Sequence, residues 1–406
     1  MRLSILPLAL AAGLGGTPPA AAASQPAWTV DGALSRPELQ RQRGSVAALR
    51  IRIDLHALQQ ADSLDLALPG GRSQRIEVVR REPRGGGDSW IIGRFAGETD
   101  ALVSLSLSNG ILGGLISAPE GNYEITTLAD GHQAVLLLDQ DEFPECATRY
   151  SEHAVAGDTA PAAALAPDAD PANRTDVLIV LSPEALIDVG GNLAQATAFA
   201  QSAVDSSNLA FRNSDMTTRF RLAGVRLTAR AETGNTGTDL PWLRDDAEVA
   251  SWRNQTGADM VSLITRNLNA CGVGYLQSSP GPGFAGSAFQ VTTRGCAVGN
   301  LSYAHEHGHN MGMGHDPGNG NGAHAWSNGH FVNGSFRTVM SYDTNCVGGC
   351  PRKPYFSNPA VNFSGQPTGI ADTRDNHRTG NLTADIVANF RASQIIFQDG
   401  LQPAQP

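Results

Sequence analysis

The sequence predicts a β-rich unit followed by an α/β unit. From about residue 45 to residue 140, short runs alternate apolar and polar residues between Gly, Asp and Asn, which is typical of antiparallel strands. Residues 154–173 are rich in Ala, Pro and Asp without an apolar period, which indicates an exposed linker. After the linker, patterns typical of strands and helices alternate. A length of 406 residues also exceeds one ordinary domain.

The first 23 residues have the pattern of an export signal. Arg2 precedes an apolar stretch from Leu3 to Leu14, and Ala21 and Ala23 fit an A-x-A cleavage site. No later window has the roughly 18 uninterrupted apolar residues that a membrane helix needs. We therefore expect a secreted protein, located outside the cell or in the periplasm of a Gram-negative bacterium, with no membrane partner.

The charge of the chain narrows the range of partners. The formal net charge is -10, and the sequence contains no basic stripe. This balance argues against nucleic acid as a partner. We expect a monomer, and the sequence leaves calcium binding undecided.

The β-rich unit is expected to span residues 24–153. Its predicted strands are Leu49–Leu55, Ile76–Arg80, Ser89–Phe95, Leu102–Leu107 and Tyr123–Thr127.

The α/β unit is expected to span residues 174–395, with residues 396–406 as a tail. Its predicted strands are Asp176–Leu181, Thr218–Thr228, Met260–Thr265 and an edge strand at Phe289–Thr293. Its predicted helices are Leu193–Phe211, Leu240–Arg253, one that begins near Asn300, and Leu382–Ala392.

The most informative motif is HEHGHNMGMGHD, from His305 to Asp316. In a helix, His305 and His309 lie one turn apart on one face, and Gly312 allows a turn that brings back His315. Three imidazoles at this spacing are typical ligands of one catalytic zinc ion, beside which Glu306 can hold a water. Three other histidines are at no ligand spacing and are interpreted as surface or core residues: His324, His330 and His377.

This motif predicts a zinc endopeptidase that acts on proteins or peptides. Three neutral imidazoles leave zinc an open position for water, and Glu306 would act as the general base that takes the proton. His307 is expected to point away from the metal, either supporting the ligands or facing solvent. The alternative is a non-catalytic, zinc-stabilised binding module, which would have no need of Glu306.

The motif resembles the extended zinc signature of the metzincins, specifically the reprolysin or adamalysin-like branch. Thr338–Tyr342 is similar to the Met-turn of that clan, which sets Met340 beneath the ligands. The resemblance implies an α+β catalytic domain with a mixed sheet and a zinc helix, preceded by a β-rich pro-domain that keeps a zymogen inactive. Tyr342 would either donate a hydrogen bond to the reaction intermediate or serve packing alone.

A narrower resemblance is to the bacterial peptidyl-Asp metallopeptidases, through Tyr355–Pro359 and Gly365–Gly369. It implies cleavage on the amino side of Asp, with self-processing at Asp168 or Asp170 as a consequence. A metzincin of broad specificity is the alternative. A pocket for Asp needs a cation, and the chain after the Met-turn offers three, each of which can also be read as a solvated surface charge: Arg337, Arg352 and Lys353.

Five cysteines in an exported chain indicate two disulfides and one free thiol. Four of them permit three pairings, of which we favour Cys271 with Cys296 and Cys346 with Cys350. Cys146 stands alone before the linker. Its thiolate would occupy the open zinc position of the zymogen, or it is a buried, incidental cysteine.

Overall fold

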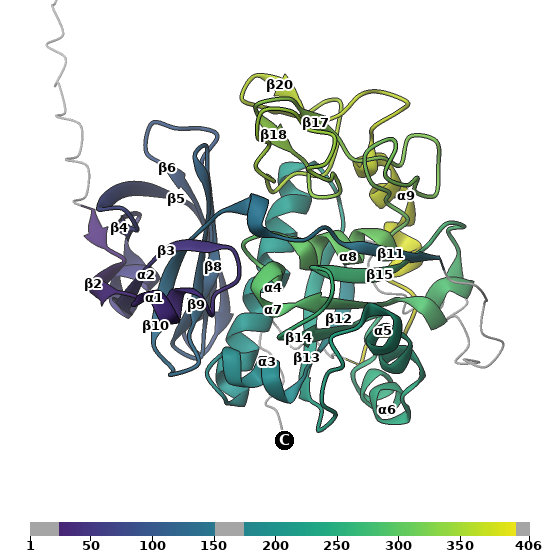
Figure 1. Ribbon diagram of the computed structural model, residues 1–406, viewed down its shortest axis with the longest axis horizontal. Helices are drawn as coiled ribbons and strands as arrows, with labels where there is room; N and C mark the ends of the chain where they lie inside the picture. The colour runs from purple at the N-terminus through teal and green to yellow at the C-terminus, as the bar shows by residue number, and fades with distance from the viewer. Residues whose placement is uncertain (1–23, 151–173, 395–406) are drawn as a thin grey trace, which may run out of the picture.

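The computed structural model describes residues 24–150 and 174–394 (Figure 1). Residues 24–138 form the β domain and residues 174–394 the α/β domain. Residues 139–150, the connecting segment, run from the first domain onto the second. The predicted export signal, the tail and the whole of the predicted linker, with Asp168 and Asp170, lie outside the described residues.

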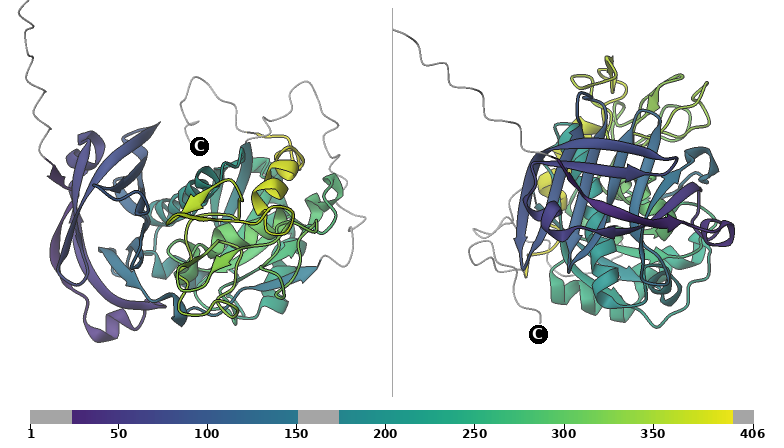
Figure 2. Two further views of the ribbon diagram at one scale, coloured as in Figure 1. Left: turned by 90° about the horizontal axis from the view of Figure 1, so that it is seen from above. Right: turned by 90° about the vertical axis from the view of Figure 1, so that its left-hand side faces the viewer.

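The β domain is built on one ten-stranded sheet in the order β1-β4-β5-β6-β7-β8-β9-β10-β3-β2. From β4 to β10 each strand pairs antiparallel with the next along the chain, as the alternating pattern predicts. Figure 2 shows the strong bend of this sheet. Its strands are β1 (Gln25–Pro26), β2 (Trp28–Ala33), β3 (Ser45–Ile53), β4 (Ser63–Leu68), β5 (Arg72–Gly85), β6 (Asp88–Phe95), β7 (Leu102–Ser108), β8 (Ile111–Ala118), β9 (Gly121–Thr127) and β10 (Gln133–Leu138). Two short helices, α1 (Arg36–Leu39) and α2 (Leu55–Gln60), complete it.

The α/β domain contains a mixed six-stranded sheet in the order β11-β15-β16-β14-β12-β13. The strands are β11 (Ala147–Tyr150), β12 (Arg174–Leu181), β13 (Arg219–Leu227), β14 (Met260–Thr265), β15 (Gly272–Leu276) and β16 (Phe289–Thr293). Strand β15 runs antiparallel to β16, whereas the neighbouring pairs in the rest of the sheet are parallel.

This order corrects two predictions. Phe289–Thr293 is not an edge strand, because β15 pairs with its outer side. Strand β11 belongs to the connecting segment and not to the β-rich unit, since it pairs parallel with β15 (Figure 1). Strand β15 was missed because its sequence, with two glycines in five residues, reads as a loop.

The helices of the α/β domain flank this sheet. They are α3 (Pro183–Asp188), α4 (Leu193–Asn213), α5 (Thr236–Asp245), α6 (Ala247–Thr256), α7 (Arg294–Ala297), α8 (Ser302–Asn310) and α9 (Asn376–Val387). The single predicted helix Leu240–Arg253 is wrong, because Asp246 ends α5 and caps α6 by accepting from the Val249 amide. The final helix begins and ends earlier than predicted. Short hairpins, β17 (Phe331–Val332) with β18 (Phe336–Arg337) and β19 (Asn362–Phe363) with β20 (Gln366–Pro367), lie between α8 and α9.

Helix α4 lies between the two sheets, packed against β13 on one side and against β7 and β8 on the other. This explains why it is buried almost all round, from Ala196 to Phe211. Asp205 of α4 is fully buried and accepts from Arg84 Nη1 of the β domain at 2.9 Å and from the Ser106 hydroxyl. The interface between the two domains therefore combines apolar packing of α4 on β7 and β8 with an ion pair between Asp205 and Arg84.

Candidate active site

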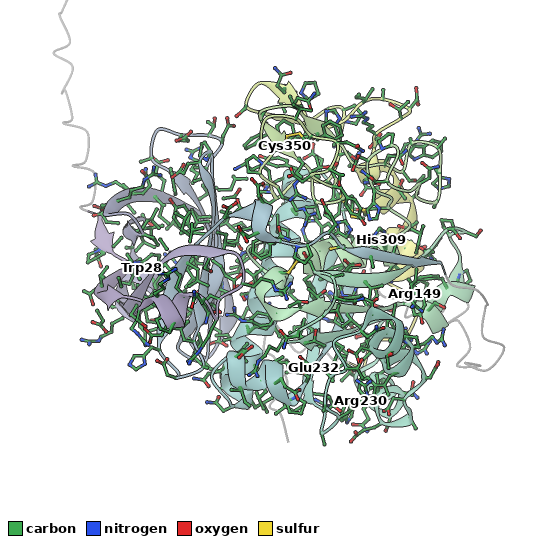
Figure 3. The ribbon with its side chains drawn as sticks, in the orientation of Figure 1. Trp28, Arg149, Arg230, Glu232, His309 and Cys350 are labelled. Carbon is green, nitrogen blue, oxygen red and sulfur yellow. A yellow bond between two sulfur atoms is a disulfide. The ribbon has the colours of Figure 1, made fainter. Side chains whose placement is uncertain are left out.

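Helix α8 carries the first part of the site. The rings of His305 and His309 have centroids 4.9 Å apart, and both side chains are buried, as is Glu306. The spacing of four residues places both rings on one helical face, as predicted. Figure 3 shows His309 beside β11 and β15, at the centre of the α/β domain.

A glycine turn brings the third imidazole back. Gly312 has φ +84°, its amide donates to His309 O, and the Met313 amide donates to Gly308 O, each at 2.9 Å. These two bonds form the hydrogen-bonding pattern of a glycine-ended helix. A Cβ on Gly312 would lie 3.1 Å from the Gln277 carbonyl oxygen, so a side chain there would be tightly packed in addition to being strained by the backbone angle. The turn places His315 next to His305, with their Nε2 atoms 3.1 Å apart.

The three rings converge as acceptors. Nδ1 of each ring lies beside a backbone carbonyl: His305 at 2.9 Å from Val339 O, His309 at 2.9 Å from Met313 O, and His315 at 2.7 Å from Asn319 O. Each Nδ1 therefore donates, which leaves the lone pairs of all three Nε2 atoms directed at one point. Three acceptors that face one another need a cation between them, so the residues fit a divalent metal ion.

Electrostatics agree with this geometry. Burial lowers the pKa of all three imidazoles, to about 4 for His315 and well below the ordinary value for His305 and His309. The rings are therefore held neutral, which is the form that binds metal. Burial raises the pKa of Glu306 well above its usual range, opposed by the Cys146 thiol, Arg352 and the Gly274 amide.

The Glu306 carboxyl lies against two glycines of β15. A Cβ on Gly272 would be 2.7 Å from Oε1 of Glu306, and one on Gly274 would be 2.7 Å from the Glu306 carbonyl oxygen. Only glycine at these positions lets β15 approach α8 this closely. Neither carboxyl oxygen has a hydrogen-bond partner of ordinary geometry among the described residues, so both remain available to a small polar molecule.

The predicted Met340 turn lies directly under α8. A Cβ on Gly308 would be 2.5 Å from Met340 Sδ, so the helix and the methionine are in close contact. Asp316 ties this turn to the third imidazole, because its Oδ1 accepts from the Tyr342 amide at 2.8 Å. The ring of Tyr342 packs on His315 with centroids 4.0 Å apart.

The connecting segment enters the site. Sγ of Cys146 lies within 4.8 Å of ligand atoms of both His305 and Glu306. Oγ1 of Thr148 lies 3.2 Å from His309 Nε2, and the Tyr342 hydroxyl donates to the Cys146 carbonyl. Burial and the nearby Glu306 raise the pKa of the Cys146 thiol. The buried thiol thus belongs to the site, and Tyr342 has a hydrogen-bond acceptor there besides its packing contact.

A cavity of about 300 Å³ opens at this point, lined by Cys146, Thr148, His309, His315, Asn321 and Tyr342. The connecting segment forms one wall, and the His315 loop and Tyr342 form the other. Removal of that segment would widen the cavity along β15.

The three candidate pocket cations are all buried, so their interpretation as solvated charges is wrong. Arg337 and Arg352 lie side by side behind the Met340 turn, and both donate to the Ser341 carbonyl. Lys353 points elsewhere, because its Nζ donates at 2.6 Å to the Ala118 carbonyl of the β domain. Only the two arginines are therefore brought to the site.

The other four histidines of the α/β domain lie outside the cluster. His307 points away from it, as expected, but is fully buried, with Nε2 at 2.8 Å from Ser262 Oγ, which excludes the interpretation that it faces solvent. His330 is buried and His324 and His377 are partly exposed, in keeping with the prediction for them.

Both favoured disulfides are present, Cys271–Cys296 and Cys346–Cys350, which leaves Cys146 as a free thiol. The first lies beside the site, since both of its cysteines pack with Cys146 in one buried cluster. Sequence reasoning missed two residues of the connecting segment that reach the site, Glu145 and Thr148, because their only signal was proximity to Cys146.

Comparisons with known proteins agree with this geometry. Residues 172–357 match the family described as Metallo-peptidase family M12. A peptidyl-Asp metalloendopeptidase of Xanthomonas campestris pv. campestris is 31% identical over 407 residues, covering 92% of this chain and 95% of the relative. One of Stenotrophomonas maltophilia is 30% identical over 372 residues, covering 84% and 86%.

A solved structure described as a chaperone-substrate complex matches with a TM-score of 0.44 and 17% identity, over 82% of this chain and 41% of the other, a likeness that carries no inference. No helix within the described residues is long and apolar enough to cross a bilayer.

The α/β fold, the imidazole cluster and the relatives together define a metalloendopeptidase. The chain belongs to metallopeptidase family M12, with the bacterial peptidyl-Asp metalloendopeptidases as relatives.

Proposed function

We propose that the chain is a zinc endopeptidase, exported as an inactive precursor, that cleaves peptide bonds in the cavity beside β15. The observation that carries this proposal is the convergence of three imidazole acceptors beside the buried Glu306 carboxyl. A binding module stabilised by zinc would need the imidazoles but not this carboxyl. Glu306 therefore favours catalysis over that alternative.

In the proposed mechanism, His305, His309 and His315 hold one zinc ion. When bound, the ion supplies a Lewis acid that polarises the scissile carbonyl and acidifies water. Glu306 takes the proton as water attacks and then passes it to the leaving amine. Burial raises the pKa of this carboxyl, which makes its ionised form a stronger proton acceptor. Once the Cys146 carbonyl has left, the Tyr342 hydroxyl is free to donate to the developing oxyanion.

Strand β15 would align the substrate. An extended peptide can add to a free sheet edge through main-chain hydrogen bonds, which bind without regard to sequence. In the described structure β11 occupies this edge, with Ala147 opposite Val273 and Tyr150 opposite Leu276. The connecting segment would therefore exclude substrate sterically.

The precursor would consist of a pro-domain at residues 24–153, a cleavable linker at 154–173 and the catalytic domain at 174–395. Cys146 and Thr148 reach the imidazole cluster from the pro-domain side, which supports a role of the thiol in latency. Activation would require cleavage in the linker, followed by departure of the connecting segment. Asp168 and Asp170 are the proposed sites of self-processing.

A preference for the amino side of Asp is the finer proposal, and broad specificity is its alternative. It is supported by the names of the relatives and by the two buried arginines beside the Met340 turn. Sequencing the products from an unfolded protein substrate would separate the two. New amino termini that begin with Asp support the preference.

The function itself is tested by metal analysis of the processed protein. We expect about one zinc per chain, loss of peptide hydrolysis on chelation, and recovery when zinc is returned. Peptidase activity that survives complete metal removal would exclude the proposed mechanism.

A further inference from the structure

Glu145 directly precedes Cys146, and its carboxyl contacts the chain that follows the Met340 turn. Oε1 accepts from the Asp343 amide at 2.7 Å, and Oε2 lies 3.9 Å from Arg352 Nη2. A carboxylate thus lies between a backbone donor and a buried guanidinium, one residue from the thiol at the imidazole cluster.

The two arginines behind this contact are unusually buried, with 3% of the Arg337 side chain and 1% of the Arg352 side chain exposed. Arg337 donates to the Cys350 and Ser341 carbonyls, and Arg352 donates to the Asn300 and Ser341 carbonyls. These acceptors are neutral.

Two carboxylates approach the arginines, and both do so at long range within the described residues. Asp343 lies 3.8 Å from Arg337, and Glu145 lies 3.9 Å from Arg352. Burial and the neighbouring Arg352 lower the pKa of Arg337 to about 10, against the opposing effect of Glu145. Two buried cations side by side are unfavourable unless carboxylates lie beside them, so this group of residues is suited to receive an anion.

We infer that Arg352, Arg337 and the Asp343 amide form a subsite for an acidic substrate side chain, and that Glu145 fills it in the precursor as a built-in substrate mimic. This inference rests on the proposed function, because it assigns the specificity pocket of the same cleft. Inhibition then has two parts, a thiol at the metal ligands and a carboxylate in the adjacent subsite.

Neighbouring contacts fix Glu145 in this position. Upstream, Gln140 Oε1 accepts from the Arg352 amide, and the buried Phe143 packs with Cys146. Downstream, Tyr342 holds the Cys146 carbonyl. Asp141 and Glu142, two other acids of the connecting segment, are exposed. Glu145 therefore differs from them in lying against the two buried arginines.

The test uses the full-length precursor and the rate at which Cys146, its free thiol, reacts with an uncharged thiol reagent under native conditions. Glu145→Gln keeps the shape of the side chain but removes its charge. We expect about a tenfold or greater increase in rate, because a charge-assisted contact holds the segment closed. Glu142→Gln, the matched control on the same segment, should stay within about twofold of wild type.

The measurement is repeated after chelation. The ratio of the thiol reaction rate of Glu145→Gln to that of wild type should be unchanged, because the subsite is made of protein groups and not of metal. The measurement after chelation therefore tests the subsite independently of the proposed zinc chemistry. That chemistry is tested by metal content and peptide hydrolysis. Equal rates for Glu145→Gln and wild type, with or without metal, would overturn the inference.

Two further variants guard against a merely structural effect. Glu145→Lys places a cation beside the two arginines and should react faster than Glu145→Gln. In an Arg352→Lys background that melts as a folded protein, the effect of Glu145→Gln should shrink, since the two groups act on each other. Two outcomes would contradict the subsite. One is a Glu145→Gln effect on the thiol reaction rate that is as large in the Arg352→Lys background as in wild type. The other is a Glu145→Lys protein whose thiol reacts no faster than that of Glu145→Gln.

Discussion

Oγ1 of Thr148 lies 3.2 Å from Nε2 of His309, although 161 positions separate the two residues in the chain. The contact joins the connecting segment to the imidazole cluster at the end of β11. Under the proposed function, the Thr148 hydroxyl and the Cys146 thiol, both from the connecting segment, thus occupy the space that water and substrate need. The predictions below follow from this arrangement.

Replacement of Glu306 by Gln should abolish peptide hydrolysis while leaving zinc in place. The amide keeps the size of the side chain but cannot accept the proton, and loss of a general base commonly costs about 10²- to 10⁴-fold in rate. The measurement is kcat/KM of the processed variant together with its zinc content. Near wild-type activity would remove Glu306 from the mechanism.

His309→Ala should lose the bound metal, because one of three converging acceptors is removed. His377→Ala is the matched control, since its ring pairs with Asp375 at 3.3 Å, outside the cluster. Zinc content by elemental analysis should fall only in the first variant. A full complement of zinc in His309→Ala would mean that the metal binds elsewhere.

Cys146→Ala should weaken latency. The full-length variant loses the thiol beside Glu306 and should hydrolyse a small peptide about tenfold or more faster than the wild-type precursor. The processed forms of both proteins should be equally active, because the segment has then left. Precursor activity unchanged by the substitution would assign Cys146 to packing alone.

Arg352→Lys in the processed enzyme should reduce discrimination between an Asp substrate and its Asn counterpart by about tenfold or more, because lysine lacks the planar set of donors. Lys353→Met is the control, since its side chain points away from the two arginines, toward the surface that the β domain covers in the precursor. The ratio of the two kcat/KM values is the measurement. Equal ratios in wild type and Arg352→Lys would place the specificity determinant elsewhere.

Acid should destabilise the α/β domain through His330. Its ring accepts from Arg374 Nη1 at 3.1 Å, and burial and Arg374 lower its pKa from 6.5 to about 4. Between these values the unfolded chain binds more protons, so the free energy of unfolding falls as the pH falls from 6.5 to 4.

Chemical denaturation at pH 7 and pH 4.5 tests this. The stability advantage of wild type over His330→Asn should shrink by about 2 kcal/mol at the lower pH. An advantage that is equal at both pH values would contradict the assigned pKa.

The cluster could be predicted from sequence because its geometry is local. His305 and His309 share a helical face, and Gly312 marks the turn to His315, so three neighbouring signals specify one point in space. The favoured disulfide pairs and helix α4 were also predicted correctly.

Other features depend on contacts between distant segments. Nothing near Ala147 indicates that it pairs with Val273, and two glycines conceal β15 itself. The burial of Arg352 likewise could not be predicted, since its acceptors are the backbone carbonyls of Asn300 and Ser341, 52 and 11 positions away, to which nothing in the sequence points. The interpretation of Arg352 as a solvated surface charge was therefore wrong, because the fold buries its side chain.

The pairing of β11 with β15 also bears on solubility. A sheet edge with free amides and carbonyls is a template for association between chains, and proteins commonly cover or charge such edges. Here the edge that would receive substrate cannot be blocked permanently without loss of function. Under the proposed function, a removable strand would resolve this conflict, because it would cover the edge during folding and export and uncover it only at maturation.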